Sequence, residues 1–165
     1  MSQAQVAAGV AGQTQAERLV RLRWSSLGAV VMLIIQFIVG IVYNLYGTAP
    51  TSTKSIGLFS SPAIALHVIL GILLGLAAIG QMVRAIGTRH KLSIWMSALG
   101  LVSIIGAGFA GLGFAGSGAA SASLGMSLAF ATALACYVVL IVALPASARA
   151  AAAPPAAESA TPSTT

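Results

Sequence analysis

The sequence contains very few acidic residues. Of its 165 residues only two are Asp or Glu, and charged residues of both signs make up 6% of the chain. Soluble domains carry about a quarter charged residues, so this composition excludes an ordinary soluble domain. The two acids, Glu17 and Glu158, lie outside the long apolar runs of the chain. Because no carboxylate falls within an apolar run, the sequence does not indicate an ion-coupled transporter or a carboxylate-based hydrolase.

Cysteine and histidine are also scarce. The single Cys136 lies within an apolar run, which excludes a disulfide framework and a C-x-x-C zinc or redox motif. The histidines number two, His67 and His90. The net charge of +6 does not indicate nucleic-acid binding, because the basic residues are few and flank apolar runs, where they anchor a membrane topology. We therefore expect no nucleic-acid partner.

Apolar residues dominate what the chain does contain, at 58% of the total. They are concentrated in four runs of about twenty residues, the length with which one helix crosses a bilayer. The predicted spans are residues 27–46, 62–83, 94–114 and 121–144. We therefore predict an all-α fold, an integral membrane four-helix bundle in contact with the lipid bilayer.

Both ends of the chain differ in composition from the spans. Residues 1–13 have no hydrophobic period and residues 146–165 are rich in Ala, Pro, Ser and Thr, so both are predicted to be disordered tails around a membrane domain of residues 14–145. Thr14 and Glu17 have the spacing of a capping box, which predicts that the first helix begins near Thr14. Pro145 is predicted to end the fourth span.

The connections between the spans carry the charge that sets the topology. The segment GTAPTSTKSIGLFSS, residues 47–61, mixes turn formers and is predicted to be a loop with Lys54 as its only cation. The second connection, of about ten residues, is basic, and the third is uncharged. Seven of the eight Lys and Arg would therefore lie on the side of the termini. Since cytoplasmic flanks carry the excess of Lys and Arg, both termini are predicted to be cytoplasmic in a multi-pass protein of a bacterial plasma membrane.

Polar residues inside the spans are few. Gln36, Gly40 and Asn44 follow one another at intervals of four residues and form one stripe of the first span, with Tyr43 beside it. Such side chains can contribute to a binding site. They can also act only as hydrogen-bonding groups between helices, at about 0.6 kcal/mol each.

His67 is the most informative residue of the second span. It shares a helical face with Gly71 and Gly75, and it lies about as deep in the membrane as Met126 of the fourth span. An imidazole facing a thioether across a bundle is a known form of axial haem ligation, which makes haem b a candidate cofactor and His67 a candidate iron ligand. The alternative is that His67 is a packing residue that donates a hydrogen bond to Gln36 or Asn44.

These residues predict a shallow pocket at the extracellular end of the bundle. Its expected walls are Tyr43, Asn44, His67 and Met126, with Gln36 deeper in the first span. For the first two helices to meet there, they would pack through Gly40 and Gly71, where bare backbones approach closely. Gly75 of the second span is also predicted to be a helix-packing position. The same small-residue spacing recurs in the fourth span, where Gly125 and Ala129 are predicted to be helix-packing positions.

The strings IIQFIVGIVYNLY and PAIALHVILGILLGL, with a proline between them, carry a resemblance to a known family. Over roughly residues 33–76 the chain resembles one four-helix half of the haem A synthase family. The resemblance implies a haem-ligating role for His67. It does not extend to the fourth helix, where the family has a second ligating histidine and this chain offers Met126. The chain is also similar to small four-helix membrane proteins of high-GC bacteria.

Two functions from different classes therefore stand. The first is a non-catalytic accessory or structural subunit of a membrane assembly, which would dock a partner membrane protein or form a homo-oligomer through its small-residue faces. The second is a b-type haem-binding module for electron transfer or haem handling. The sequence assigns no catalytic residue and favours a non-enzymatic role.

Overall fold

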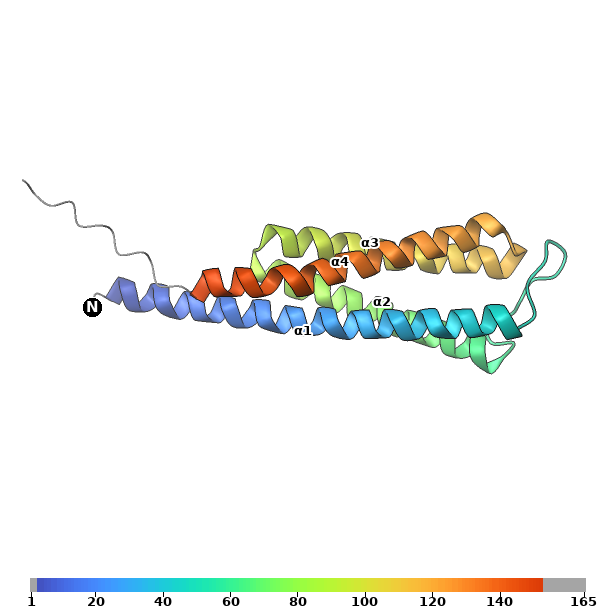
Figure 1. Ribbon diagram of the computed structural model, residues 1–165, viewed down its shortest axis with the longest axis horizontal. Helices are drawn as coiled ribbons and strands as arrows, with labels where there is room; N and C mark the ends of the chain where they lie inside the picture. The colour runs from blue at the N-terminus through green and yellow to red at the C-terminus, as the bar shows by residue number, and fades with distance from the viewer. Residues whose placement is uncertain (1–2, 153–165) are drawn as a thin grey trace, which may run out of the picture.

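The computed structural model describes residues 3–152, with side chains over residues 14–144, and consists of a four-helix bundle. The helices are α1 (Gln3–Tyr46), α2 (Pro62–Thr88), α3 (Lys91–Ser117) and α4 (Ala120–Ala152). Neighbouring helices are antiparallel, and contacts join α1 to α2, α2 to α3, α3 to α4 and α4 to α1 (Figure 1). Within the described residues no contact joins α1 to α3 or α2 to α4, so these pairs occupy the diagonals of the bundle.

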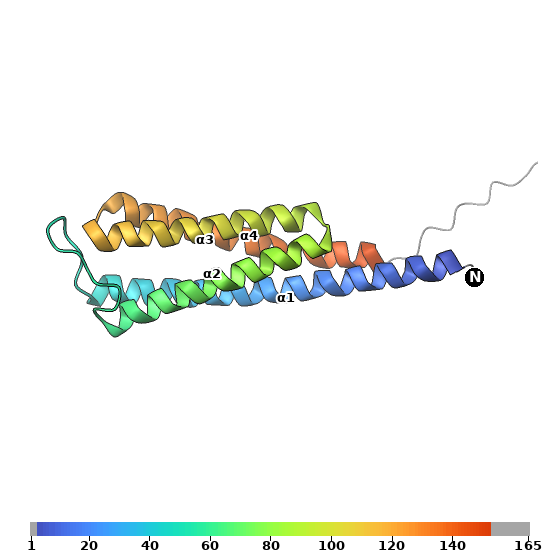
Figure 2. The same ribbon diagram turned by 180° about the vertical axis from the view of Figure 1, so that it is seen from behind.

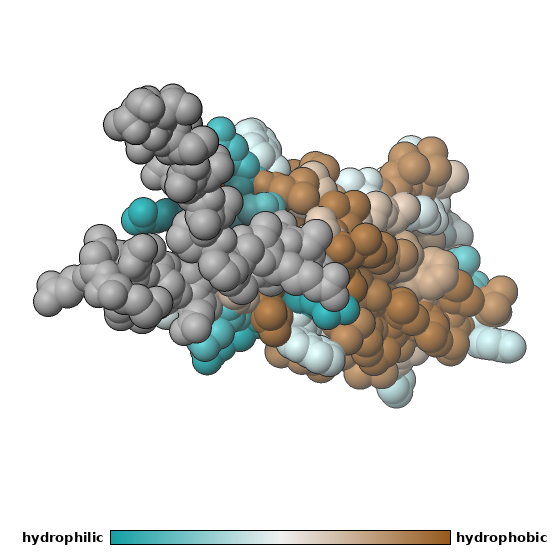
Figure 3. All heavy atoms as spheres, turned by 60° about the vertical axis from the view of Figure 1, so that its left-hand side comes forward, coloured by the Kyte–Doolittle hydropathy of each residue, from teal (hydrophilic) through white to brown (hydrophobic). Residues whose placement is uncertain are grey.

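The four predicted spans each lie inside one helix. Four helices, over Thr14–Tyr46, Pro62–Thr88, Lys91–Ser117 and Ala120–Leu144, are long and apolar enough to cross a membrane, with mean hydropathy between 1.9 and 2.4. Figure 3 shows apolar side chains as a nearly continuous surface along the bundle. The chain is therefore a small four-span membrane protein, as the sequence predicted.

The outer helices are longer than predicted. α1 begins at Gln3 and not near Thr14, so residues 3–13 are helical, and the expected capping box lies inside the helix. α4 continues through Pro145 to Ala152. Both extensions are rich in alanine, the residue with the highest helix propensity, and extending a formed helix is much easier than starting one. Residues 153–165 of the predicted tail lie outside the described residues.

The connections also differ from expectation. α2 and α3 are joined by only Arg89 and His90, because α2 continues to Thr88, and Arg89 takes a left-handed conformation with φ 53°. Gly118, with φ 66°, ends α3, and a Cβ at this position would clash with the carbonyl oxygen of Pro50. This contact brings the loop of residues 47–61 against the α3–α4 turn.

The bundle has two ends that differ in their packing. We call the half that carries the chain termini and the α2–α3 connection the terminal half, and the half that carries the 47–61 loop and the α3–α4 turn the loop half. Figures 1 and 2 show the α1/α2 hairpin and the α3/α4 hairpin close together in the terminal half and diverging toward the loop half.

Most buried residues of the terminal half follow one another at intervals of three and four, the heptad period of packed helix pairs, and the buried Ser103 and Cys136 lie outside this pattern. This pattern appears on every helix: Leu19, Leu22, Ser26, Ala29 and Leu33 on α1; Leu74, Ala78, Gln81, Ala85 and Thr88 on α2; Ser93, Ser97, Gly100 and Ile104 on α3; Ala133, Tyr137, Leu140 and Leu144 on α4. In the loop half the heptad positions continue, but no described helix residue there is buried. The core therefore occupies one half of the bundle.

Candidate functional site

The α1/α2 pair is joined in the loop half by a reciprocal arrangement of one polar residue and one glycine on each helix. The ring of His67 lies over Gly40, where a Cβ would come within 3.2 Å of His67 Cε1. The side chain of Gln36 lies over Gly71, where a Cβ would come within 3.2 Å of Gln36 Nε2. Gly40 and Gly71 therefore both lie in the contact between α1 and α2. Each is packed against a polar side chain of the opposite helix and not against its backbone.

One hydrogen bond fixes this arrangement. Gln36 Nε2 donates to the backbone carbonyl of His67 at 2.9 Å. Two polar atoms beside it, Gln36 Oε1 and His67 Nδ1, are buried and have no hydrogen-bond partner in the described part of the chain. One alternative from the sequence was that His67 donates a hydrogen bond to Gln36 or Asn44. The structure shows no such bond. A buried polar atom without a partner is costly, and it calls for an unseen partner such as a water or a bound group.

The α3/α4 hairpin repeats this use of glycine. Met126 lies against α3, with its sulfur 3.3 Å from the position of a Cβ on Gly111. In the terminal half, the ring of Tyr137 lies over Gly100 with its Cζ 3.0 Å from the equivalent position. Thus His67 and Met126 occupy similar places, each covering a glycine of the preceding helix.

His67 and Met126 lie at the same level of the bundle. The rings of Phe37 on α1 and Phe130 on α4 stack with their centroids 4.7 Å apart, which aligns the two hairpins. Gly40, under His67, is three residues from Phe37, and Met126 is four residues from Phe130, both toward the loop end. At 1.5 Å per residue, each lies about one turn, ~5 Å, beyond the stack. Their helices, α2 and α4, stand on a diagonal.

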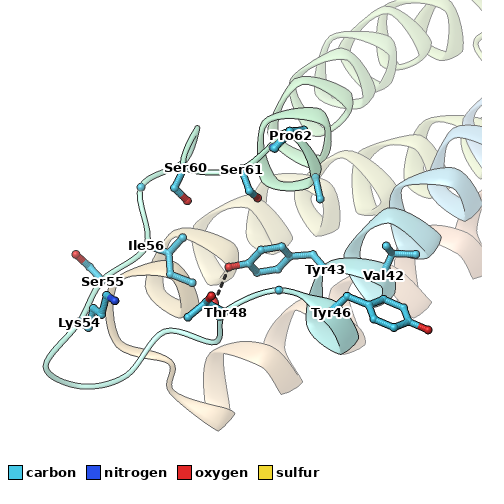
Figure 4. A pocket seen from close by; sticks show the side chains of 13 residues that line it. Val42, Tyr43, Tyr46, Thr48, Lys54, Ser55, Ile56, Ser60, Ser61 and Pro62 are labelled. Carbon is cyan, nitrogen blue, oxygen red and sulfur yellow. Dashed lines mark hydrogen bonds between the residues drawn. The ribbon is translucent and has the colours of Figure 1, made fainter.

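The predicted pocket of four residues is corrected by the structure. The cavity nearest to it, of about 630 Å³, lies at the loop end and has Tyr43 in its wall but not Asn44, His67 or Met126 (Figure 4). The Tyr43 hydroxyl donates to the Thr48 carbonyl at 2.6 Å, and Asn44 is exposed. His67 turns to α1 and Met126 to α3. All four residues lie in the loop half, but the sequence could not give the directions of their side chains.

The remaining predicted positions are distributed as follows. Gly125 is a packing position, with Ala110 Cβ 3.5 Å from the position of a Cβ, whereas a Cβ at Gly75 would meet open space. Ala129 is half-buried. Among the described residues, no group of three or more His, Cys, Asp or Glu could hold a metal ion. His67 is thus the single imidazole of the loop half.

A second polar cluster, which the sequence analysis missed, joins α1 and α2 in the terminal half. The buried Gln81 donates from Nε2 to Ser26 Oγ at 2.7 Å and accepts from Ser25 Oγ at 3.4 Å. Arg84 Nη1 donates to Ser25 Oγ at 2.9 Å. The sequence contained one signal for this cluster, because Ser26 and Gln81 lie at heptad positions of their helices. This cluster satisfies its own polar atoms, which indicates a structural role.

Comparison of the chain with protein-family models, with curated proteins and with solved structures found no match to any of them.

Proposed function

We propose that this four-span protein is a non-catalytic accessory or structural subunit of a membrane assembly. One observation carries the proposal: the heptad positions of the terminal half are buried, whereas those of the loop half are only half-buried. Interior positions that the chain does not cover with its own side chains are available to an added group. A partner helix, from another membrane protein or from a second copy, would complete the loop half.

The residues at these positions suit a helix partner. Ala107 and Gly111 lie on α3 at heptad positions that continue the buried series of Ser93, Ser97 and Gly100. Small residues let helix backbones approach closely, which is the main source of helix association in a bilayer. Met126 covers Gly111, so Ala107, which is half-buried, is the position of this α3 face that a partner helix would contact.

Site-specific photo-crosslinking tests this role. A photoreactive side chain replacing Ala107 should produce a discrete crosslinked protein in intact membranes. The same probe replacing Val102, which is 64% exposed on the surface of α3, should crosslink to lipid. A product of twice the chain's own mass would identify a homo-oligomer. Crosslinks from residue 107 to lipid alone would refute the proposal.

A second candidate function is b-type haem binding. It is favoured because His67 and Met126 lie at the same height along the bundle. The chain's own residues fit such a group in two respects. His67 Nδ1 is buried without a partner, and the histidine and the methionine stand on diagonal helices. The His67 ring and the Met126 sulfur cover Gly40 and Gly111, so both side chains would turn toward the centre of the bundle to hold a haem. His67 and Met126 would be the axial ligands, and the bound haem would supply one-electron chemistry.

The absorption spectrum of the purified protein tests this candidate. Haem binding should give a sharp band in the reduced protein, and His67→Asn should abolish it while the protein still inserts in the membrane. Met126→Leu, which nearly conserves volume, should shift the band. His90→Asn is the matched control, because His90 is the other histidine and lies in the α2–α3 connection. A colourless protein in which His67→Asn has no effect would exclude haem and leave the subunit proposal standing.

A further inference from the structure

The cavity at the loop end lies at the level where the spans end. Its walls come from the last turn of α1, the loop and the first turn of α2. They include Val42 and Tyr46, and Pro62 and Ala63 (Figure 4). Its volume of about 630 Å³ falls within the range of roughly 300–1,000 Å³ that ligand sites occupy. Because the walls begin where the apolar spans end, the cavity adjoins the headgroup region of a bilayer.

The cavity contains the only charged side chain of the loop half. Lys54 lines it, and no other Lys or Arg and no Asp or Glu lies among the described residues of that half. Of the two acids in the chain, Glu17 is in the terminal half and Glu158 lies outside the described residues. Among the described residues, the ammonium group of Lys54 therefore has no carboxylate counter-ion near it, and a cation of this kind attracts an anionic ligand.

The loop holds Lys54 in a defined place. Thr51 and Lys54 exchange two backbone hydrogen bonds, of 3.0 and 3.2 Å, and the Lys54 amide also lies 3.1 Å from the Thr51 hydroxyl. The Ile56 amide donates to the carbonyl of Ala115 on α3 at 2.9 Å, which ties the loop to the other hairpin. The cation is thus carried by an ordered turn, and ordering before binding reduces the entropic cost of binding.

Hydroxyl groups stand around the same space. Ser55 and Ser60 line the cavity, and neither side chain forms a hydrogen bond within the described part of the chain. Ser61 caps α2 by accepting a hydrogen bond from the Ile64 amide at 3.3 Å. Because Ser61 also lines the cavity, the positive end of this helix lies beside it. Figure 4 shows Lys54, Ser60 and Ser61 on the segment that arches over Tyr43 and Thr48.

We propose that this cavity binds a phosphate group, with Lys54 as its counter-ion and the serine hydroxyls as donors, and that the phosphate belongs to an anionic lipid headgroup. The lipid source follows from the position of the cavity. Val42 and Tyr46, in its wall, are 45% and 85% exposed, so acyl chains can run along α1 while the headgroup enters. The inference is independent of both functions proposed above.

Binding of short-chain lipids to the full-length purified protein tests the proposal. Titration with dihexanoyl phosphatidylglycerol should give saturable binding that is about tenfold weaker in Lys54→Gln, the loss expected for one charge-assisted hydrogen bond. Lys54→Arg should retain the affinity. Lys91→Gln is the matched control, because Lys91 is an exposed cation at the other end of the bundle, and it should leave binding unchanged.

Two further ligands distinguish the sources of the phosphate. Dihexanoyl phosphatidylcholine, whose headgroup has no net charge, should bind more weakly than phosphatidylglycerol. Inorganic phosphate that bound as tightly as phosphatidylglycerol, with the same Lys54 dependence, would keep the phosphate site and replace the lipid by a free anion. Equal binding of phosphatidylglycerol to the wild type and to Lys54→Gln would overturn the proposal, as would the absence of saturable binding.

Discussion

The terminal half and the loop half of the bundle are built from the same helices but use them differently. In the terminal half, Leu22, Leu33, Leu74, Leu140 and Leu144 are at most 3% exposed and form a continuous core. In the loop half the corresponding heptad positions hold Gln36, Gly40, His67, Gly111 and Met126, and none is buried. One half is thus closely packed, whereas the interior positions of the other are only half-buried.

The glutamines of the two halves differ in their hydrogen-bond partners. The buried Gln81 has partners for both of its side-chain atoms, Ser26 and Ser25. Gln36 has one partner, the His67 carbonyl, and its Oε1 has none. A satisfied polar cluster stabilises a fold, whereas an unsatisfied one in a half-buried position is typical of a place where something else binds. Unpartnered buried atoms are not confined to the loop half, however, since Ser97 Oγ and the Tyr137 hydroxyl of the terminal half also have no partner among the described residues.

The largest expected effect concerns which half faces the cytoplasm. Since seven of the eight Lys and Arg belong to the terminal half and its extensions, a reporter fused after Thr165 should be active as a cytoplasmic enzyme. A reporter inserted near Thr53, in the loop, should be active only outside the cytoplasm. The activities of paired alkaline phosphatase and fluorescent protein fusions measure this. The reverse pattern would place the loop cavity inside the cell.

A cavity made in the terminal half should cost the most stability. Leu140→Ala removes a side chain that is 0% exposed, and we expect a loss of about 2–3 kcal/mol, near the low end for such substitutions. The low end applies because lipid is as apolar as the protein interior, so mainly packing is lost. Reversible unfolding in mixed detergent micelles measures it. Leu128→Ala, at a residue 60% exposed, is the control; equal losses would contradict the division into halves.

Replacing Gln81 and Gln36 in turn separates the two polar clusters. Gln81→Leu should lower the free energy of unfolding by about 1 kcal/mol, because Ser26 and Ser25 both lose a partner. Gln36→Leu removes one donor, but it also removes a buried oxygen without a partner, so the expected loss is under ~0.6 kcal/mol. The same unfolding assay compares them. A larger loss for Gln36→Leu would show that the loop half also depends on its polar contacts for stability.

The smallest expected effect separates two glycines of the helix pair α1/α2. A Cβ at Gly75 meets open space, so Gly75→Ala should be neutral or stabilise the protein by up to ~1 kcal/mol through helix propensity. A Cβ at Gly40 would lie 3.2 Å from the His67 ring, so Gly40→Ala should gain less or lose stability. Thermal unfolding of both variants checks the order. Equal gains would show that the His67 ring moves away freely.

The sequence located the candidate site by chemistry but not by geometry. Gln36, Gly40, His67 and Gly71 could be chosen because polar residues and glycines are rare in apolar spans, and all four do meet in the structure. Tyr43 and Asn44 were placed in the same pocket from depth alone. Depth along a helix is set by residue number, whereas direction around the helix depends on how the helix is rotated against its neighbours.

Composition and length determined the four spans, because crossing a bilayer requires about twenty apolar residues whatever their neighbours are. The sequence also determined that the loop half has a single cation. Only the tertiary structure decided three further features. They are the heptad registers, the reciprocal pairing of Gln36 and His67 with glycines, and the shared level of His67 and Met126. The physical reason is that lipid-facing and protein-facing sides of these helices are almost equally apolar. The pattern that reveals the buried face of a soluble helix is therefore weak here, and side-chain packing between helices determines which residues meet.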